Sequence, residues 1–152
     1  MLQNTLMAIL LVVSLVNLAH AQDVDFVNLG VRVEGISHNR GEVGVALFSS
    51  PKGYPSHIEH AYEVQWVGVQ DGPNAIEVVF EGLPFGDYAV SVFHDENGNR
   101  TLERSTLGFP KEGVGFSNDQ KVTLSAPSFN ASKFTLSKAE DLQVVVALDY
   151  RE

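Results

Sequence analysis

Residues Phe80 to Ser117 read FEGLPFGDYAVSVFHDENGNRTLERSTLGFPKEGVGFS, and this stretch decides the fold. Apolar and polar side chains alternate on both sides of its Pro84–Gly86 turn, and a period of two predicts half-buried β-strands. The strand after the turn is predicted over Asp87 to His94. A long segment without a sustained period follows, Asp95 to Asn118. Long ordered loops are often where a protein binds its ligand.

The same alternation recurs on both sides of this stretch. Further strands are predicted at Val27–Gly35, Glu42–Phe48, Glu63–Gln70, Ala75–Leu83, Lys121–Leu124, Lys133–Leu136 and Asp141–Tyr150. The first two are predicted to form a hairpin. Seven or eight short strands separated by turn residues, without a long helical period, predict an all-β fold. We expect a single antiparallel β-sandwich, prealbumin-like or immunoglobulin-like, with one long loop.

The amino terminus has the pattern of an export signal. Residues Leu6 to Leu18 form an apolar run, and Ala19-His20-Ala21 places small residues where a signal peptidase reads them. The run is shorter than the roughly 20 residues of a membrane-spanning helix. We therefore expect residues 1–21 to be a signal peptide and residues 22–152 to form one domain. The expected location is periplasmic or extracellular, without membrane insertion after cleavage.

Charge and cysteine content exclude several classes of function. The formal net charge is −9, which disfavours nucleic acids and anionic membranes as partners, because both attract basic surfaces. The chain has no cysteine, so disulfides, thiolate metal sites and cysteine nucleophiles are excluded. The abundant carboxylates leave hard cations as candidate ligands.

The long segment opens with a candidate calcium loop. Oxygen-bearing side chains recur with the spacing by which one loop wraps a calcium ion, and Thr101 could add its backbone carbonyl. Glu112 and Asp119 are additional donors. The alternative is a plain turn at Asn97–Gly98 whose polar neighbours are solvated. The predicted ligands are Asp95, Asn97, Asn99, Thr101 and Glu103.

Two other chemistries compete with calcium binding. His57, His60 and Glu63 would share a face if residues 56–63 were helical, and could then hold zinc. A small hydrolase or lyase could use His94 with Asp95 or Glu103 as its acid–base groups.

Four motifs resemble one family, the exported bacterial proteins described as domain of unknown function 2141. The resemblance covers roughly Val27 to Leu148 and implies a periplasmic or extracellular β-sandwich without an established activity. The family usually has glycine where this chain has Arg100, and often aspartate where it has Glu103. Residues Phe80 to Val90 are also similar to a hairpin of prealbumin-like and collagen-adhesin modules. The family motifs are Val78–Pro84, Gly86–Val90, Phe93–Asn99 and Gly108–Asn118.

These observations predict an exported, non-enzymatic binding module. The expected binding surface is the loop from Asp95 to Asn118, ordered by calcium, and the expected partner is a component of the cell envelope or the extracellular space. A purely structural module of envelope assembly is a further alternative, which an exposed apolar patch or an unpaired edge strand would indicate.

Overall fold

The computed structural model describes residues 26–69, 75–138 and 140–151. The predicted signal peptide and the turn at residues 71–74 lie outside these ranges. Within them, no helix is both long and apolar enough to cross a membrane. The strands are β1 (Phe26–Glu34), β2 (Glu42–Phe48), β3 (Glu63–Gly68), β4 (Ala75–Pro84), β5 (Gly86–Asp95), β6 (Val114–Phe116), β7 (Phe134–Leu136) and β8 (Leu142–Ala147). The short helices are η1 (Ile58–His60), η2 (Ser117–Asp119) and α1 (Phe129–Ser132).

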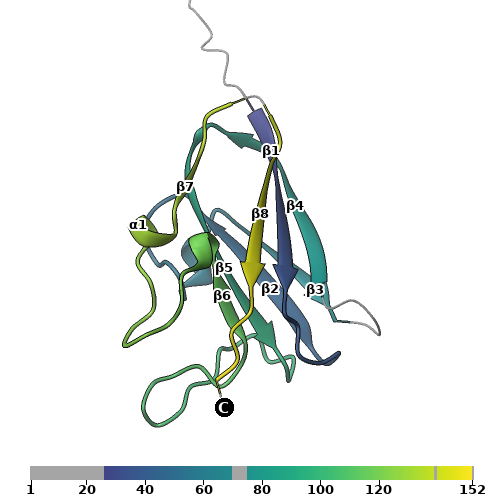
Figure 1. The fold of residues 1–152 in the computed structure, drawn as a ribbon, viewed down its shortest axis with the longest axis vertical. Coiled ribbons are helices and arrows are strands. Elements are labelled where there is room, and N and C mark those ends of the chain that lie inside the picture. The colour runs from purple at the N-terminus through teal and green to yellow at the C-terminus, as the bar shows by residue number, and fades with distance from the viewer. Residues whose placement is uncertain (1–25, 70–74, 139, 152) are drawn as a thin grey trace, which may run out of the picture.

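The strands form two sheets that face each other, as the sequence predicts (Figure 1). The first sheet has the order β4-β1-β8, and the second has the order β3-β2-β5-β6 with β7 paired to the start of β5. All pairs are antiparallel except β1 with β8, which is parallel. The all-β sandwich prediction is therefore confirmed, apart from this one parallel pair.

The main core lies between the sheets and comes from the inward positions of the alternating strands. Burial of each large apolar side chain stabilises the fold by about 1.5–3 kcal/mol. Tyr88, Val90 and Val92 of β5 belong to this core, and His94 continues the same face. The fully enclosed apolar side chains of the core include Leu29, Val31, Val33, Val43, Val45, Leu47, Phe80, Leu83, Val90 and Val146.

The predicted hairpin of the first two strands is wrong, because β1 and β2 belong to different sheets. β1 pairs with β4 and β8, whereas β2 pairs with β3 and β5. The Pro84–Gly86 turn likewise joins β4 of one sheet to β5 of the other and closes no hairpin. A period of two identifies the face that a strand buries, and it carries no information about the neighbouring strand.

Two short elements also differ from the prediction. β6 lies inside the segment predicted as loop, and residues 121–124 form no strand. β6 matters because it closes one side of the sandwich. A Cβ added at Gly115 would lie 2.7 Å from both the Ala147 carbonyl oxygen and Val146 Cγ1, so only glycine lets β6 approach β8 this closely.

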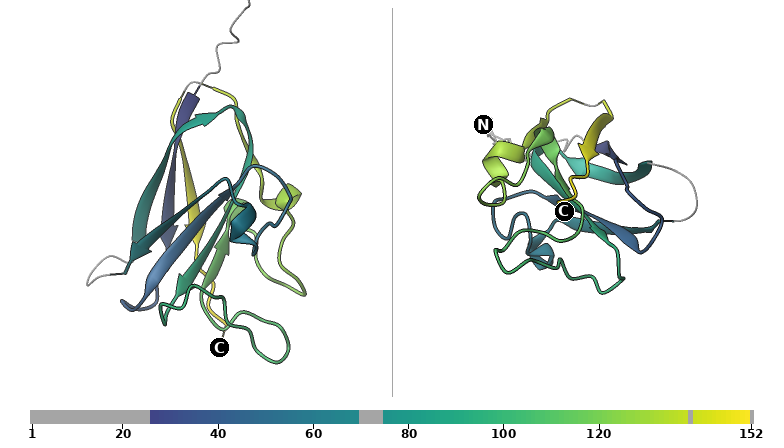
Figure 2. Two further views of the ribbon diagram at one scale, coloured as in Figure 1. Left: turned by 180° about the vertical axis from the view of Figure 1, so that it is seen from behind. Right: turned by 60° about the horizontal axis from the view of Figure 1, so that its bottom comes forward.

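The loop between β5 and β6 extends from the end of the sandwich where the chain also finishes (Figures 1 and 2). Phe109 and Phe116 pack in one apolar cluster with Val114 and Val122. This cluster pins the loop to the second sheet.

Candidate ligand-binding groove

A buried carboxylate folds the first half of the long loop. Asp95 is fully buried at the end of β5. Its Oδ1 accepts hydrogen bonds from the backbone amides of Gly98 at 2.9 Å and Asn99 at 3.1 Å, and its Oδ2 accepts one from Arg100 at 2.6 Å. Arg100 takes the left-handed conformation, with φ of 56°. The chain turns sharply here because one side chain gathers three successive amides.

A second buried carboxylate holds the loop from the other side. Glu112 accepts the backbone amides of Glu96 and Glu103, each at 3.1 Å. Asp95 and Glu112 together satisfy five loop amides, and hydrogen bonds to charged groups stabilise more than neutral ones. Both residues therefore act as anchors of the loop. Asp119, the other additional donor considered for calcium, lies exposed in η2.

The five predicted calcium ligands lie within one hydrogen-bonded loop. Glu103 Oε1 accepts from the side-chain amide nitrogens of Asn97 at 3.1 Å and Asn99 at 3.4 Å. The side-chain oxygens of these asparagines accept the backbone amides of Asn99 at 3.0 Å and Thr101 at 2.8 Å. Asp95 completes the set through the three amides described above. The fold therefore brings the five predicted residues together. Most of their side-chain oxygens accept hydrogen bonds from amide groups of the same loop.

A groove of about 360 Å³ lies on the outer face of the second sheet, between the helical turn η1 and the long loop. Its floor is made of small side chains of β2. A Cβ added at Gly44 would lie 2.7 Å from the Trp66 ring, so glycine leaves room for the indole to lie across β2. The lining also includes Ala46, Pro55, Ile58, Val64, Ser91, Phe93, Arg100, Leu102, Arg104, Pro110, Phe116 and Val122.

Aromatic rings and a guanidinium form one wall of this groove. Trp66 and Phe93 meet edge to face with ring centroids 5.3 Å apart. The Arg100 guanidinium lies 4.9 Å above the Trp66 ring and pairs with Glu42 at 3.2 Å. Arg100 therefore connects the loop anchored by Asp95 to the aromatic wall, through a cation–π contact and an ion pair.

Arg104 carries a positive charge without an acidic partner. Its guanidinium donates to the Gly108 carbonyl at 3.1 Å and approaches Ser56 Oγ at 3.5 Å. Among the described residues, no carboxylate lies within ion-pair distance of it. The acidic residue of the lining, Glu59, faces His57 at 3.1 Å. In a chain of net charge −9, Arg104 makes the groove locally attractive to an anion.

His94 lies outside this groove, on the opposite face of β5. It is fully buried, and its Nδ1 lies 2.7 Å from the Tyr150 hydroxyl while its Nε2 lies 2.6 Å from the Arg40 carbonyl oxygen. Burial raises the pKa of Tyr150, and the nearby Glu96 raises that pKa further, so the phenol stays protonated at neutral pH. Both ring nitrogens of His94 therefore already have partners.

The predicted zinc set is not brought together. η1 ends at His60, and Glu63 opens β3, where it accepts from the Gln65 side chain at 2.9 Å. Within the described part of the chain, one group of three histidine and acidic side chains has its ligand atoms within 4.8 Å of one another. That group is a different one, His38, His94 and Glu96.

Sequence reasoning located the loop but missed most of the groove. Trp66 and Arg104 lie 38 residues apart, and they come to one face only through the pairing of β3, β2 and β5 and the path of the long loop. One local signal was available. Gly44, Ala46 and Ser91 are small residues on the outward positions of strands whose inward positions are large and apolar.

Comparison with known proteins gives a family and no individual relative. No curated protein and no solved structure matches the chain, so the similarity to prealbumin-like modules stays a prediction. The family model described as "Uncharacterized protein conserved in bacteria (DUF2141)" matches residues 31–144, which is most of the 152-residue sequence. The matched range includes the anchored loop and the groove lining. The resemblance first drawn from four short motifs is thereby confirmed, and the chain belongs to the DUF2141 family.

Proposed function

We propose that this protein is an exported, non-enzymatic binding module whose groove takes a small amphipathic anion, an apolar molecule that carries one carboxylate or a similar group. The observation that carries the proposal is the guanidinium of Arg104, which has no acidic partner among the described residues and lies at the rim of an apolar groove.

The size and lining of the groove support a small, largely apolar ligand. A volume of about 360 Å³ lies at the lower end of the range of small-molecule sites, roughly 300–1,000 Å³. Trp66, Phe93 and Phe116 offer ring faces and edges, and Ala46 and Val64 offer aliphatic surface. Flat apolar molecules fit such a wall through stacking and edge contacts.

The charges of the groove support an anionic group on that ligand. A guanidinium matches the planar geometry of a carboxylate with two parallel N–H donors. The Arg104 guanidinium already donates hydrogen bonds to the Gly108 carbonyl and to Ser56 Oγ. These two bonds fix the position of the guanidinium at the groove. Arg100 is shared between Glu42 and Trp66 and contributes less.

The composition of the lining favours binding over hydrolysis. The hydroxyl groups of Ser56, Ser91 and Thr101 line the groove, and none of the described lining residues is a histidine. The carboxylate of the lining, Glu59, faces His57, and Ser91 Oγ donates to the Pro55 carbonyl. His94, on which the hydrolase or lyase alternative depends, is enclosed on the other face of β5 with both nitrogens engaged.

The proposal includes weak calcium binding by the loop of residues 95–103. Support comes from the gathering of Asp95, Asn97, Asn99 and Glu103 and from the left-handed turn at Arg100. Since both oxygens of Asp95 already accept amides, the expected affinity is that of weak extracellular modules, on the order of 10⁻⁴ to 10⁻³ M.

Two fluorescent probes of the same shape test the groove. 1-Anilinonaphthalene-8-sulfonate is anionic, and N-phenyl-1-naphthylamine is its uncharged counterpart. We expect saturable one-site binding of both to the folded protein, with the anion bound more tightly. Arg104→Ala should remove that preference, a loss of about 10- to 150-fold for one charged hydrogen-bonded contact. The matched control is Arg32→Ala, which removes an ion-paired arginine from the other sheet. Equal binding of both probes, or an equal loss in the control, would refute the proposal.

A calcium titration tests the loop separately. Ligand binding stabilises the native state by mass action, so millimolar calcium should raise the melting temperature, and magnesium should do so less. The highest calcium concentration, 10 mM, is about 10-fold or more above the expected dissociation constant. An unchanged melting temperature at that concentration would refute calcium binding by the loop, and it would not bear on ligand binding in the groove.

A further inference from the structure

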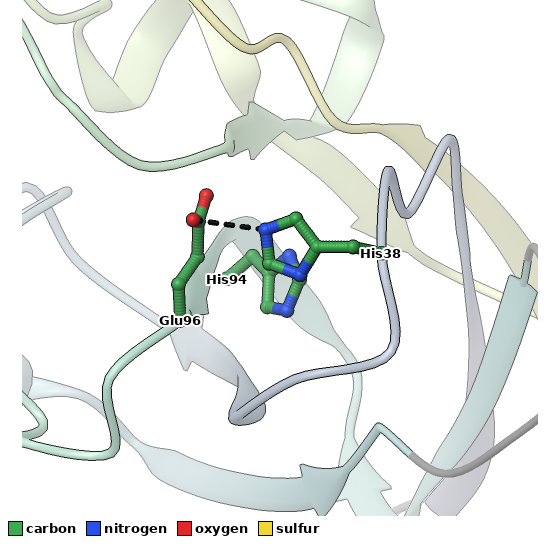
Figure 3. A group of neighbouring side chains, drawn as sticks. All are labelled: His38, His94 and Glu96. Carbon is green, nitrogen blue, oxygen red and sulfur yellow. Dashed lines mark ion pairs between the residues drawn. The ribbon is translucent and has the colours of Figure 1, made fainter.

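A second cluster of polar side chains lies at the end of the sandwich. His38 belongs to the connection between β1 and β2, His94 lies near the end of β5, and Glu96 follows β5. Their ligand atoms all lie within 4.8 Å of one another. Figure 3 shows the imidazole of His38 beside that of His94, with the Glu96 carboxylate directed at His38. None of the three lines the groove.

His38 has a nitrogen that the described protein leaves without a partner. Its Nε2 lies 2.8 Å from Glu96 Oε2, and its buried Nδ1 has no hydrogen bond. A carboxylate only accepts, so Nε2 carries the proton and Nδ1 of the neutral ring presents a lone pair. A buried polar atom without a partner destabilises the folded state. The site therefore gains from any species that accepts this lone pair.

The tautomer of His94 is set by its surroundings in the same way. The Arg40 carbonyl can only accept, so Nε2 of His94 carries the proton and Nδ1 holds the lone pair. That lone pair accepts from the Tyr150 hydroxyl, whose oxygen in turn accepts from the Ser37 amide at 3.2 Å. A histidine whose second nitrogen donates to a backbone carbonyl is the usual arrangement of a metal ligand.

We propose that His38 and His94 bind a late first-row divalent transition ion such as Zn²⁺ through their Nδ1 atoms, with Glu96 as the outer partner that accepts from Nε2 of His38. Imidazole nitrogens suit such ions better than calcium or magnesium, which prefer oxygen ligands. Water would take the remaining positions of a tetrahedral ion.

Binding requires two local movements. Bonds of about 2.0–2.1 Å place tetrahedral ligand atoms about 3.3 Å apart, so the Nδ1 atoms of the two histidines must come to that separation. His38 can supply this movement because it lies in a connection between strands and is partly exposed. The hydroxyl of Tyr150 must also leave Nδ1 of His94, since it occupies the position of the ion.

The test is isothermal titration of the purified folded protein with zinc chloride. One equivalent should bind to the wild type. His38→Ala should weaken binding by at least about 100-fold, because losing a ligand exceeds the 10- to 100-fold loss typical of an outer partner. Glu96→Gln should weaken binding less, by about 10- to 100-fold, because Glu96 is the outer partner of His38. The control is the double variant His57→Ala/His60→Ala, which removes two exposed imidazoles, one preceding η1 and one at its end, and should bind zinc like the wild type.

Tyr150→Phe separates a metal site from a merely structural cluster. Removing the hydroxyl frees the Nδ1 lone pair of His94, so zinc affinity should rise by about 2- to 10-fold, the equivalent of one lost hydrogen bond. Long-range ¹H–¹⁵N spectra should show zinc shifting the Nδ1 signals of both histidines. Absence of one-equivalent binding, loss of binding in the His57/His60 control, unchanged affinity in His38→Ala or weaker binding in Tyr150→Phe would each overturn the proposal.

Discussion

Asp95→Asn isolates the role of the carboxylate that anchors the long loop. The substitution keeps the shape and one accepting oxygen, so the bonds from Gly98 and Asn99 can persist as weaker, neutral ones. The new amide nitrogen would face the Arg100 amide, which now donates to Oδ2 at 2.6 Å. One charge-assisted hydrogen bond, worth about 1.5–3 kcal/mol, is replaced by two opposed donors.

The expected loss of unfolding free energy is about 2–3 kcal/mol. It is limited to that range because the Arg100 amide lies in an exposed loop and can find water, although the Asp95 side chain itself is fully enclosed. Glu81→Gln makes the same chemical change on an exposed strand position and should stay within about 0.5 kcal/mol of the wild type.

Urea unfolding, followed through the single tryptophan Trp66 in the presence of EDTA, measures this difference. Hydrogen exchange should accelerate at the amides of residues 98–100. A change below about 0.5 kcal/mol in EDTA would refute the anchoring role. An effect that emerges only when calcium is added would assign Asp95 to ion binding instead.

Three further predictions follow from single contacts. Burial raises the pKa of Tyr54 to about 12, so the stability that its neutral phenol contributes is complete below pH 10 and falls as the pH rises toward 12. Alkaline unfolding of the wild type, compared with Tyr54→Phe, should show a loss of about 2 kcal/mol that the variant lacks. Gly113→Ala should destabilise the protein by about 1–3 kcal/mol in urea unfolding, because the new Cβ would collide with the Tyr150 ring. Arg100→Gly should leave stability within about 1 kcal/mol, since relief of its left-handed φ offsets the lost contact with Trp66; a larger loss of stability would contradict this balance.

The strands were predictable because each one buries a single face, and alternation reports burial directly. β1 and β5 were placed within one or two residues of their observed bounds on this basis. The pairing was not predictable, since the same alternation fits either sheet. β6 was missed because Val114–Phe116 is too short to show a period, and residues 121–124 have strand composition without a partner strand.

The side chains of the candidate site were predictable only where they are neighbours in sequence. Asp95, Asn97 and Asn99 were found by spacing, and the structure does bring them together. The partnership of His38 with His94 depends on a connection and a strand that lie 56 residues apart in the sequence. The available signal was the alternation of β5. His94 follows Val92 on the inward face, so an imidazole lies at a core position, where its two nitrogens need hydrogen-bond partners.

The groove and the histidine cluster are separated by the pleat of one strand. Phe93 points to the groove and His94 to the sandwich interior, because successive side chains of β5 lie on opposite faces of the sheet. The two sites can therefore be tested independently, since variants of Arg104 and His38 alter different faces. They are coupled only through the backbone that Asp95 and Glu112 hold in place. A variant of either anchor should accordingly weaken probe binding and zinc binding together, which neither Arg104→Ala nor His38→Ala should do.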